Sequence, residues 1–408
     1  MEIPGVPPQL LEALIAAAAG QRLALVGGAV RDLLLHREHN DPWRGLPDLD
    51  LVVEGQAADL VERLELPAIA RPHGAFGTVE LELRLPGQKS DQPQIWLVDL
   101  ASARQEVYPQ SAENPTVQFA RLDDDLARRD FTVNAMALVL AGDGSGWVLL
   151  DPYGGQADLA RRQLRLLHPH SLRDDPTRLL RAARYSARLG FELAPESLQQ
   201  AAATLEAWPW AWSTEDNPAK APPALGTRLR MELELLLERE PWRQALAVLA
   251  AWGGLALLDS QLQADRHWRR RLEWAQRLGL PLLAALVAGA ADPLALAERL
   301  QLPHRKYKLL AQFLELRQRL SEATPDSPSA WCALLEAPGL SPEAVALALA
   351  SGIGPRRPLL HWWVRWRHVP APLSAAELMA QEGLNPGPGL GERLRQLRAE
   401  RLDQAEVV

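Results

Sequence analysis

Two apolar runs separated by a glycine turn constrain this chain more than any other feature of its sequence. Residues 23–26 read Leu-Ala-Leu-Val, end at Gly27 and Gly28, and pass into residues 29–35. This order predicts a strand, a tight turn and the start of a helix. A glycine pair lets backbone N–H groups approach a phosphate closely, with the N-terminus of the helix behind them.

Two carboxylates stand at the start of the second apolar run, residues 51–53. Asp48 and Asp50 are two positions apart, so a strand would direct both to one face of the sheet. Carboxylates this close usually share a cation or a proton, and such hard oxygen ligands suit Mg²⁺. Either feature alone is common in ordinary turns and solvated loops. Together, with a strand on each side, they predict phosphoryl or nucleotidyl transfer.

Composition narrows the class of protein. The 408 residues are enough for about two to four domains. The single cysteine, Cys332, excludes an intrachain disulfide and fits a reducing compartment. Residues 10–19 are apolar but too short to span a bilayer, and no signal-peptide pattern is present, so we expect a cytoplasmic protein without a membrane partner. A net charge of −7 argues against a uniformly basic coat but leaves room for local basic patches.

The secondary-structure pattern changes near residue 150. Before it, apolar runs and alternation predict strands with helices between them; after it, long Leu/Ala/Arg stretches predict helices, with no strong strand signal. We therefore expect an α+β protein, with a small sheet in a head over residues 1–150 and an all-helical remainder. The predicted strands are residues 23–26, 48–53, 78–85, 94–100 and 132–140, and the predicted head helices are residues 29–36, 57–66 and 123–128.

Two further segments of the head carry candidate functional groups. Residues 95–99 resemble a strand that ends in a third carboxylate, Asp99, which could complete a metal shell or activate a hydroxyl. A cap of the next turn is an equally good interpretation of Asp99. Residues 128–137 place Arg129 and Asp130 within an apolar segment, where arginine can bind a triphosphate and aspartate can accept from ribose hydroxyls. A surface ion-pair cluster is the alternative there.

A row of polar residues recurs every three positions after Asp174. The row is Asp175, Arg178, Arg181 and Arg184, which predicts one face of a helix. Such a row is ordinarily a solvated face with ion pairs, but Leu179, Leu180 and Tyr185 offer other faces to a core. A carboxylate only accepts and a guanidinium only donates hydrogen bonds, so a fixed Asp–Arg pair would accept cytosine and adenine and reject uracil and guanine.

These blocks together resemble the class II tRNA nucleotidyltransferase and bacterial poly(A) polymerase family. The matching blocks are residues 27–32, 48–50, 128–135, 151–155, 175–184 and 226–232. The resemblance covers about residues 20–240 and implies a polymerase β-like nucleotidyltransferase head over residues 1–150. It further implies a helical neck with the nucleotide-selecting helix over residues 151–240, and a helical, tRNA-binding body and tail over residues 241–408.

The resemblance also implies an activity and its residues. The family extends the 3′ end of tRNA with CMP and AMP from CTP and ATP, and Asp48 and Asp50 would hold the catalytic Mg²⁺, with Asp99 as the third catalytic carboxylate. Asp175 and Arg178 would form the protein template for the base. The implied nucleotide-binding residues are Gly27, Gly28, Arg31, Arg129, Asp130, Asn134, Asp175, Arg178, Arg181 and Arg184.

Three segments bear on how closely the family pattern is followed. The family usually has Glu where this chain has Asp174, and residues 39–44 resemble an inserted loop. Residues 103–115 lie where the family carries a flexible loop linked to the A-adding step, which favours CCA or A-only addition over CC-only addition. An A-only enzyme, a poly(A) polymerase and a noncatalytic RNA-binding protein remain alternatives.

Basic stretches with interleaved aromatic residues occur in the C-terminal half, at residues 266–271, 304–308 and 356–368. Basic side chains bind phosphates, and aromatic rings can stack on bases. Each stretch alone could be a solvated helix face. As a set, on a protein whose head handles nucleotides, they favour binding of tRNA by its shape; the oligomeric state is left open.

Overall fold

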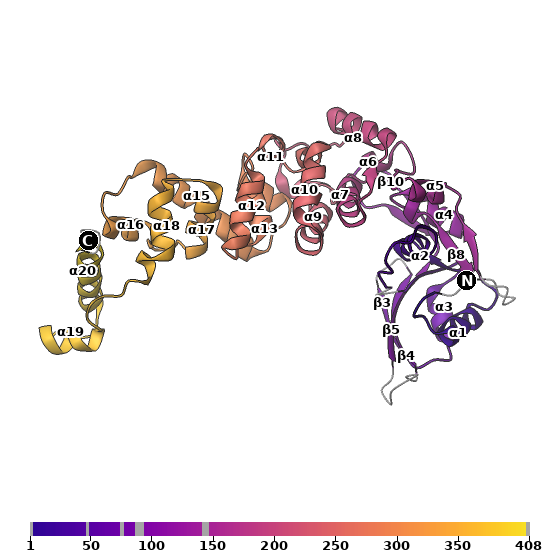
Figure 1. Cartoon of the computed structure of the whole chain (residues 1–408), viewed down its shortest axis with the longest axis horizontal. Coiled ribbons are helices and arrows are strands. Elements are labelled where there is room, and N and C mark those ends of the chain that lie inside the picture. The colour runs from indigo at the N-terminus through magenta and orange to yellow at the C-terminus, as the bar shows by residue number, and fades with distance from the viewer. Residues whose placement is uncertain (1–2, 46–48, 74–76, 86–93, 141–146, 405–408) are drawn as a thin grey trace. The chain divides into compact units, whose positions relative to one another are not determined.

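The chain forms two compact units in the computed structural model, which describes residues 3–45, 49–73, 77–85, 94–140 and 147–404. The first unit holds a β-sheet with helices around it, and the second is helical (Figure 1). The predicted α+β class, with a small sheet in the head and helices after it, is confirmed. The first unit comprises Met1–Ala211, Pro222–Ala224 and Glu240–Trp252, and the second comprises Trp212–Ala221, Leu225–Arg239 and Gly253–Val408.

Within the described residues, seven strands form one mixed sheet in the order β3-β4-β5-β2-β1-β8-β9. β1 is an inner strand and antiparallel to both of its neighbours, whereas β2 and β5 run parallel to each other. All four residues of β1 are buried, as a continuous apolar run predicts for an inner strand. The strands are β1 Leu23–Val26, β2 Leu49–Val53, β3 Ala68–His73, β4 Thr78–Leu85, β5 Gln94–Ser102, β8 Ala137–Leu140 and β9 Trp147–Leu150.

The sequence did not predict several of the strands. β6 (Arg104–Val107) and β7 (Thr116–Phe119) form a separate antiparallel pair of mostly polar residues. Beyond residue 150, where no strong strand signal was found, β10 (Gln163–Leu164) and β11 (Glu192–Leu193) form a short parallel pair. The strand predicted over residues 132–140 is wrong in its first half, because residues 132–134 form a 3-10 turn before β8 begins.

A short helix, α4 (Leu122–Ala127), packs on one face of the sheet. Leu122 and Leu126 join a buried cluster with Ala24 and Val26 of β1 and with Val52 of β2. Burial of these apolar groups fixes α4 over the central strands, since the side chains one turn apart face the same way. The residues that follow α4 are therefore held beside the C-terminal end of β1.

Of the remaining helices of the first unit, α1, α2 and α3 lie beside the sheet, and α7, α8 and α10 lie away from it (Figure 1). α7 and α10 pack against each other, so the chain segment after residue 239 returns to this unit. The helices are α1 Pro8–Ala18, α2 Gly28–His39, α3 Ala57–Glu62, α5 Gly155–Ala160, α6 Ser171–Asp174, α7 Thr177–Leu189, α8 Pro195–Ala207 and α10 Trp242–Ala251.

The second unit is built around α17 (Pro342–Ser351), in which every residue from Ala344 to Ala350 is buried. α12, α15 and α18 pack against it. No helix among the residues that the structure describes is both long and apolar enough to cross a membrane. The helices are α9 Thr227–Arg239, α11 Ser260–Ala264, α12 Trp268–Arg277, α13 Leu282–Val287, α14 Pro293–Arg299, α15 His304–Glu322, α16 Pro328–Leu335, α17, α18 Arg356–Val364, α19 Ala375–Glu382 and α20 Pro388–Gln404.

Candidate active site

Carboxylates from neighbouring strands form a row across the sheet. Asp50 of β2 is the register partner of Asp99 on the parallel strand β5, and Asp99 is in turn the partner of Glu80 on β4. Side chains of register partners lie on one face of a sheet, a few ångströms apart. The structure therefore brings together Asp50 and Asp99, which are 49 positions apart in sequence and which we predict as carboxylates of one site.

The metal-binding prediction for Asp48 and Asp50 is not tested by this row. Asp48 lies outside the described residues, so its side chain is not placed. Among the residues that are described, no group of three or more Asp, Glu, His or Cys side chains is arranged to hold a metal ion. Asp50 and Asp99 together offer carboxylate oxygens of the kind that hard divalent cations take, and a further ligand from Asp48 stays a prediction.

The glycine turn follows β1 directly and lies next to the row. Extending the β1–β2 register by one pair places Asp50 opposite Val26, the residue before Gly27. Gly27 has φ +67° and ψ −133°, a conformation that is open to glycine and costly for other residues, and it precedes the first residue of α2. A methyl group built on Gly27 would lie 2.8 Å from Nη1 of Arg129, so the backbone and this guanidinium approach each other closely.

A buried polar network lies beside the turn. Oδ1 of Asp130 accepts hydrogen bonds from the backbone N–H of Phe131 and from Nδ2 of Asn134, the latter at 2.9 Å. Its Oδ2 accepts from Nε of Arg181 at 2.8 Å. Arg31, which is only 3% exposed, donates to Oδ1 of Asn134 at 2.8 Å and to Asp32. Burial alone would raise the pKa of Asp130, but Arg181 and the hydrogen bond from Asn134 hold it below its ordinary value.

The predicted row is not a solvated face, and only its three arginines lie on α7, because Asp175 is in extended conformation before the helix begins. Asp175, Arg178 and Arg184 are buried, and each is held differently. Asp175 accepts from the backbone N–H and the hydroxyl of Thr177, at 3.0 and 2.6 Å, at the start of α7. Nη2 of Arg178 donates to the backbone carbonyl of residue 128 at 3.0 Å, and Arg184 pairs with Glu240 at 3.4 Å.

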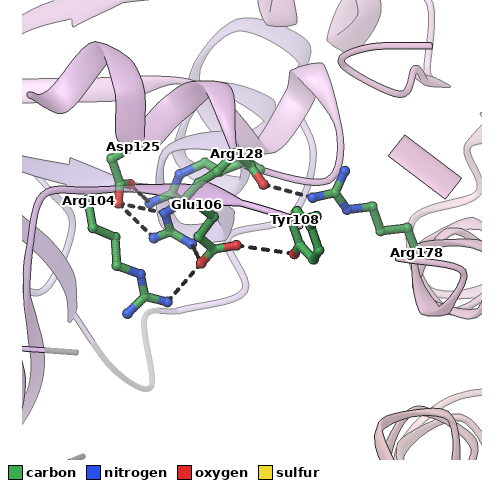
Figure 2. Close-up of polar contacts among 7 residues, drawn as sticks. Arg104, Glu106, Tyr108, Asp125, Arg128 and Arg178 are labelled. Atoms are coloured by element: carbon green, nitrogen blue, oxygen red, sulfur yellow. Dashed lines mark hydrogen bonds and ion pairs between the residues drawn. The ribbon is translucent and has the colours of Figure 1, made fainter. Parts of the chain in front are cut away.

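A cavity of about 390 Å³ opens beside Arg178. It is lined by Glu106 of β6 and by Tyr108, which follows β6, together with Arg128 and His168. Figure 2 shows Arg178 directed toward the backbone of Arg128, whose side chain reaches Glu106. Burial and the adjacent Arg178 lower the pKa of His168, so this imidazole is held neutral near the guanidinium.

Two other segments that the sequence singled out have structural roles. In residues 151–155, Gly154 precedes α5, and the Asp151 carboxylate accepts from the backbone N–H of Gly155 at 2.6 Å, which makes the segment a helix start. In the basic stretch 266–271, Arg271 is buried and donates to the carbonyl of Ala285 at 2.7 Å, so this residue does not face an RNA.

Sequence reasoning missed Asp125, which is fully buried and binds both Arg128 and Arg129. It stands in a run of three aspartates, which looks like an ordinary acidic helix start. The available signal was spacing, because Asp125 alone of the three is three and four residues before the arginine pair. Glu106 was also missed, since its strand carries no apolar pattern.

Comparisons with known proteins agree with this architecture. A family profile described as "Poly A polymerase head domain" matches residues 23–165. The CC-adding tRNA nucleotidyltransferase of Deinococcus radiodurans is 39% identical over 355 residues, which cover 85% of this chain and 84% of that protein. The A-adding tRNA nucleotidyltransferase of Aquifex aeolicus is 41% identical over 179 residues, which cover 42% of this chain and 19% of that protein.

A solved structure of similar fold is the Thermotoga maritima CCA-adding enzyme complexed with tRNA. It has a TM-score of 0.66 and 25% sequence identity, and the match covers 98% of this chain and 93% of that chain. The sequence similarity to the Deinococcus enzyme extends over most of both chains. The chain therefore belongs to the tRNA nucleotidyltransferase family and is an enzyme of that class.

Proposed function

We propose that this protein transfers nucleotides from CTP and ATP to the 3′ end of tRNA without a nucleic-acid template. The observation that carries the proposal is that three groups lie close together at the inner strands β5, β2 and β1. These are the Asp50–Asp99 pair, the turn at Gly27, and Arg129, whose guanidinium lies against that turn. A polymerising transferase needs these parts together, because the hydroxyl, the triphosphate and the ion must meet at one phosphorus atom.

Nucleotidyltransferases of this family generally use a divalent metal ion, and we propose Mg²⁺ held by Asp48, Asp50 and Asp99. The donor set fits, since Mg²⁺ prefers carboxylate oxygens and takes further ligands from substrate phosphates. When bound, the ion would supply charge stabilisation to the transferring phosphoryl group. The protein's own part is to fix Asp50 and Asp99 on adjacent, register-paired strands.

The triphosphate and the ribose would be bound by residues on either side of the turn. Backbone N–H groups at Gly27 and Gly28 open α2, where a helix N-terminus favours an anion. Arg129 adds a positive charge at the same point. Asp130, kept ionised by Arg181, would accept from ribose hydroxyls.

Base selection is assigned to Asp175 and Arg178. Both are buried before any nucleotide binds, and Arg178 borders the 390 Å³ cavity. An acceptor and a donor held in this way would match the amino group and ring nitrogen of cytosine or adenine. Uracil or guanine would leave buried polar groups unpaired, which is the origin of strong discrimination.

The product has two candidates. The relative matched over 84% of its length is a CC-adding enzyme, which supports addition of CMP residues and is opposite to what residues 103–115 led us to expect. The A-adding relative matches 42% of this chain, and the presence of the 103–115 segment supports addition of the terminal AMP as well. We propose CMP transfer as the first activity and leave AMP transfer to the test.

The test uses tRNA that lacks CCA, tRNA ending in C, tRNA ending in CC, and an unrelated RNA, each with labelled CTP, ATP or both. Two CMP residues added to the first substrate, with no AMP on the third, would identify a CC-adding enzyme. AMP on the third substrate alone would identify an A-adding enzyme, and CMP followed by AMP a CCA-adding enzyme. Long AMP tails on the unrelated RNA would identify a poly(A) polymerase.

The same experiment can also refute nucleotide transfer altogether. No incorporation on any substrate, with tRNA still bound, would favour the noncatalytic RNA-binding alternative.

For the rest of the chain, we propose a head over residues 1–150, a nucleotide-selecting neck over 151–240 and a tRNA-binding body and tail over 241–408. We also propose a cytoplasmic location, where tRNA ends are processed.

A further inference from the structure

Asp125 is a buried carboxylate to which the proposed transfer reaction assigns no role. It lies on α4 and is fully buried, whereas Asp123 on the same helix keeps half of its side chain exposed. The burial follows from packing, because Leu122 and Leu126 seat this helix on the sheet. A charge removed from water in this way is tolerated only when it is paired and hydrogen-bonded.

Both oxygens of Asp125 bind arginine. Oδ1 accepts from Nε and Nη2 of Arg128 at 3.0 and 2.7 Å, and Oδ2 accepts from Nη2 of Arg129 at 2.9 Å. Figure 2 shows the Asp125 carboxylate beside the side chain of Arg128. Burial alone would raise the pKa of Asp125, yet Arg129 and Arg128 hold it below its ordinary value, so the carboxylate is charged.

Arg128, which binds Asp125, is itself held by Glu106. Its Nη1 donates to Oε1 of Glu106 at 3.0 Å, and Glu106 also accepts from Arg104 at 3.2 Å and from the Tyr108 hydroxyl at 3.3 Å (Figure 2). Asp125 is therefore held by a chain of charged contacts that continues into the β6 segment. A carboxylate anchored in this way can impose a direction on the second arginine that it binds.

That second arginine leads to the predicted phosphate site. Nη1 of Arg129 lies against Gly27, and Nε of Arg129 is buried with no hydrogen-bond partner among the residues that the structure describes. The direction of this guanidinium therefore depends on its Nη2 bond to Asp125.

We propose that Asp125 is a positioning residue for nucleotide binding, which holds Arg129 against the Gly27–Gly28 turn so that its guanidinium meets the triphosphate. Asp125 does not touch the nucleotide and acts only through Arg129. The proposal rests on the proposed function, since it requires a nucleoside triphosphate at this turn. It predicts coupling between residues 125 and 129 in triphosphate affinity, which a purely structural ion pair would not produce.

The experiment measures CTP and CMP affinity by calorimetry in the full-length protein and its variants. Asp125→Asn should weaken CTP binding about ten-fold, the cost of one misplaced charge-assisted hydrogen bond, and should change CMP binding much less. Arg129→Met should weaken CTP binding by at least as much. Adding Asp125→Asn to Arg129→Met should then have no further effect, and the control Asp123→Asn should bind CTP as the wild type does.

Three outcomes would overturn the positioning role. One is wild-type CTP affinity in folded Asp125→Asn; another is full additivity of the two substitutions. If Asp125→Asn does not fold, Asp125→Glu keeps the charge and moves the carboxylate by one methylene, and wild-type CTP affinity in that variant would also refute it. A wild-type protein that binds no CTP would instead refute the proposed function.

Discussion

Gly27→Ala should be the most damaging small substitution in the turn after β1. Two independent costs meet at this position. The backbone has φ +67° and ψ −133°, a region that alanine rarely adopts. The added methyl group would also lie 2.8 Å from Nη1 of Arg129.

The first cost can be expressed as an energy and the second as a displacement of Arg129. Forcing a residue with a side chain into such a sparsely populated conformation costs about 1–3 kcal/mol, so we take about 2 kcal/mol. An ordinary contact needs about 3.5 Å, so Arg129 would have to move by about 0.7 Å. That shift lengthens its 2.9 Å hydrogen bond to Asp125 and should weaken CTP binding as well as the fold.

Amide hydrogen exchange is the suitable assay, because it reports the opening of β1 without assuming that both units unfold in one step. A loss of about 2 kcal/mol should raise exchange in the β1 peptide about thirty-fold. Gly28→Ala is the matched control, since its methyl group would lie 3.4 Å from Arg31 in an ordinary helical start, where alanine is preferred to glycine. Equal exchange in the two variants would refute the reasoning.

Four further outcomes are expected. Asp50→Asn should abolish CMP transfer while tRNA still binds in a gel-shift assay, whereas substitution of the exposed Asp59 by Asn should leave transfer unchanged. Substantial transfer activity in Asp50→Asn would show that Asp50 is not part of the site. Arg178→Lys keeps the charge but loses the planar fork, so competition between labelled CTP and UTP should show relaxed selection; unchanged discrimination would refute the base-reading role. Because the pKa of Asp130 is lowered, its stabilisation is present above about pH 4 and is lost as pH falls through the folded value; acid unfolding followed by circular dichroism should be less steep in Asp130→Asn. Burial, with Glu336 nearby, raises the pKa of Cys332 to about 12, so a thiol reagent at pH 8 should label it only after unfolding.

The sequence predicted the inner strands better than the edges of the sheet. β1 and β4 have the expected bounds, because buried strands leave a clear apolar run or alternation. β3 was missed, since Pro72 within it argues against a strand and is tolerated here at the end of the sheet order. β6 and β7 pair only with each other and carry polar residues, so they left no apolar pattern to detect.

The candidate site was predictable as a set of residues but not as a set of contacts. Spacing indicated that Asp50 has a carboxylate neighbour within its own strand, yet the partner that the described residues show is Asp99, brought in by strand pairing. Equally, spacing grouped the arginines of α7 into one row. It could not indicate which partner each arginine has, because those partners come from Glu240, which precedes α10, and from the segment after α4.

The different partners of that row have a consequence for selectivity. Arg178 is bound to a backbone carbonyl, Arg181 to Asp130 and Arg184 to Glu240, before any nucleotide arrives. Side chains fixed in this way lose little conformational freedom on binding, and they cannot turn to suit a base of the wrong pattern. Discrimination between bases would therefore come from the rigidity of the contacts behind Arg178 as much as from Arg178 itself. A substitution that loosens those contacts should then relax base choice even though it never touches the base.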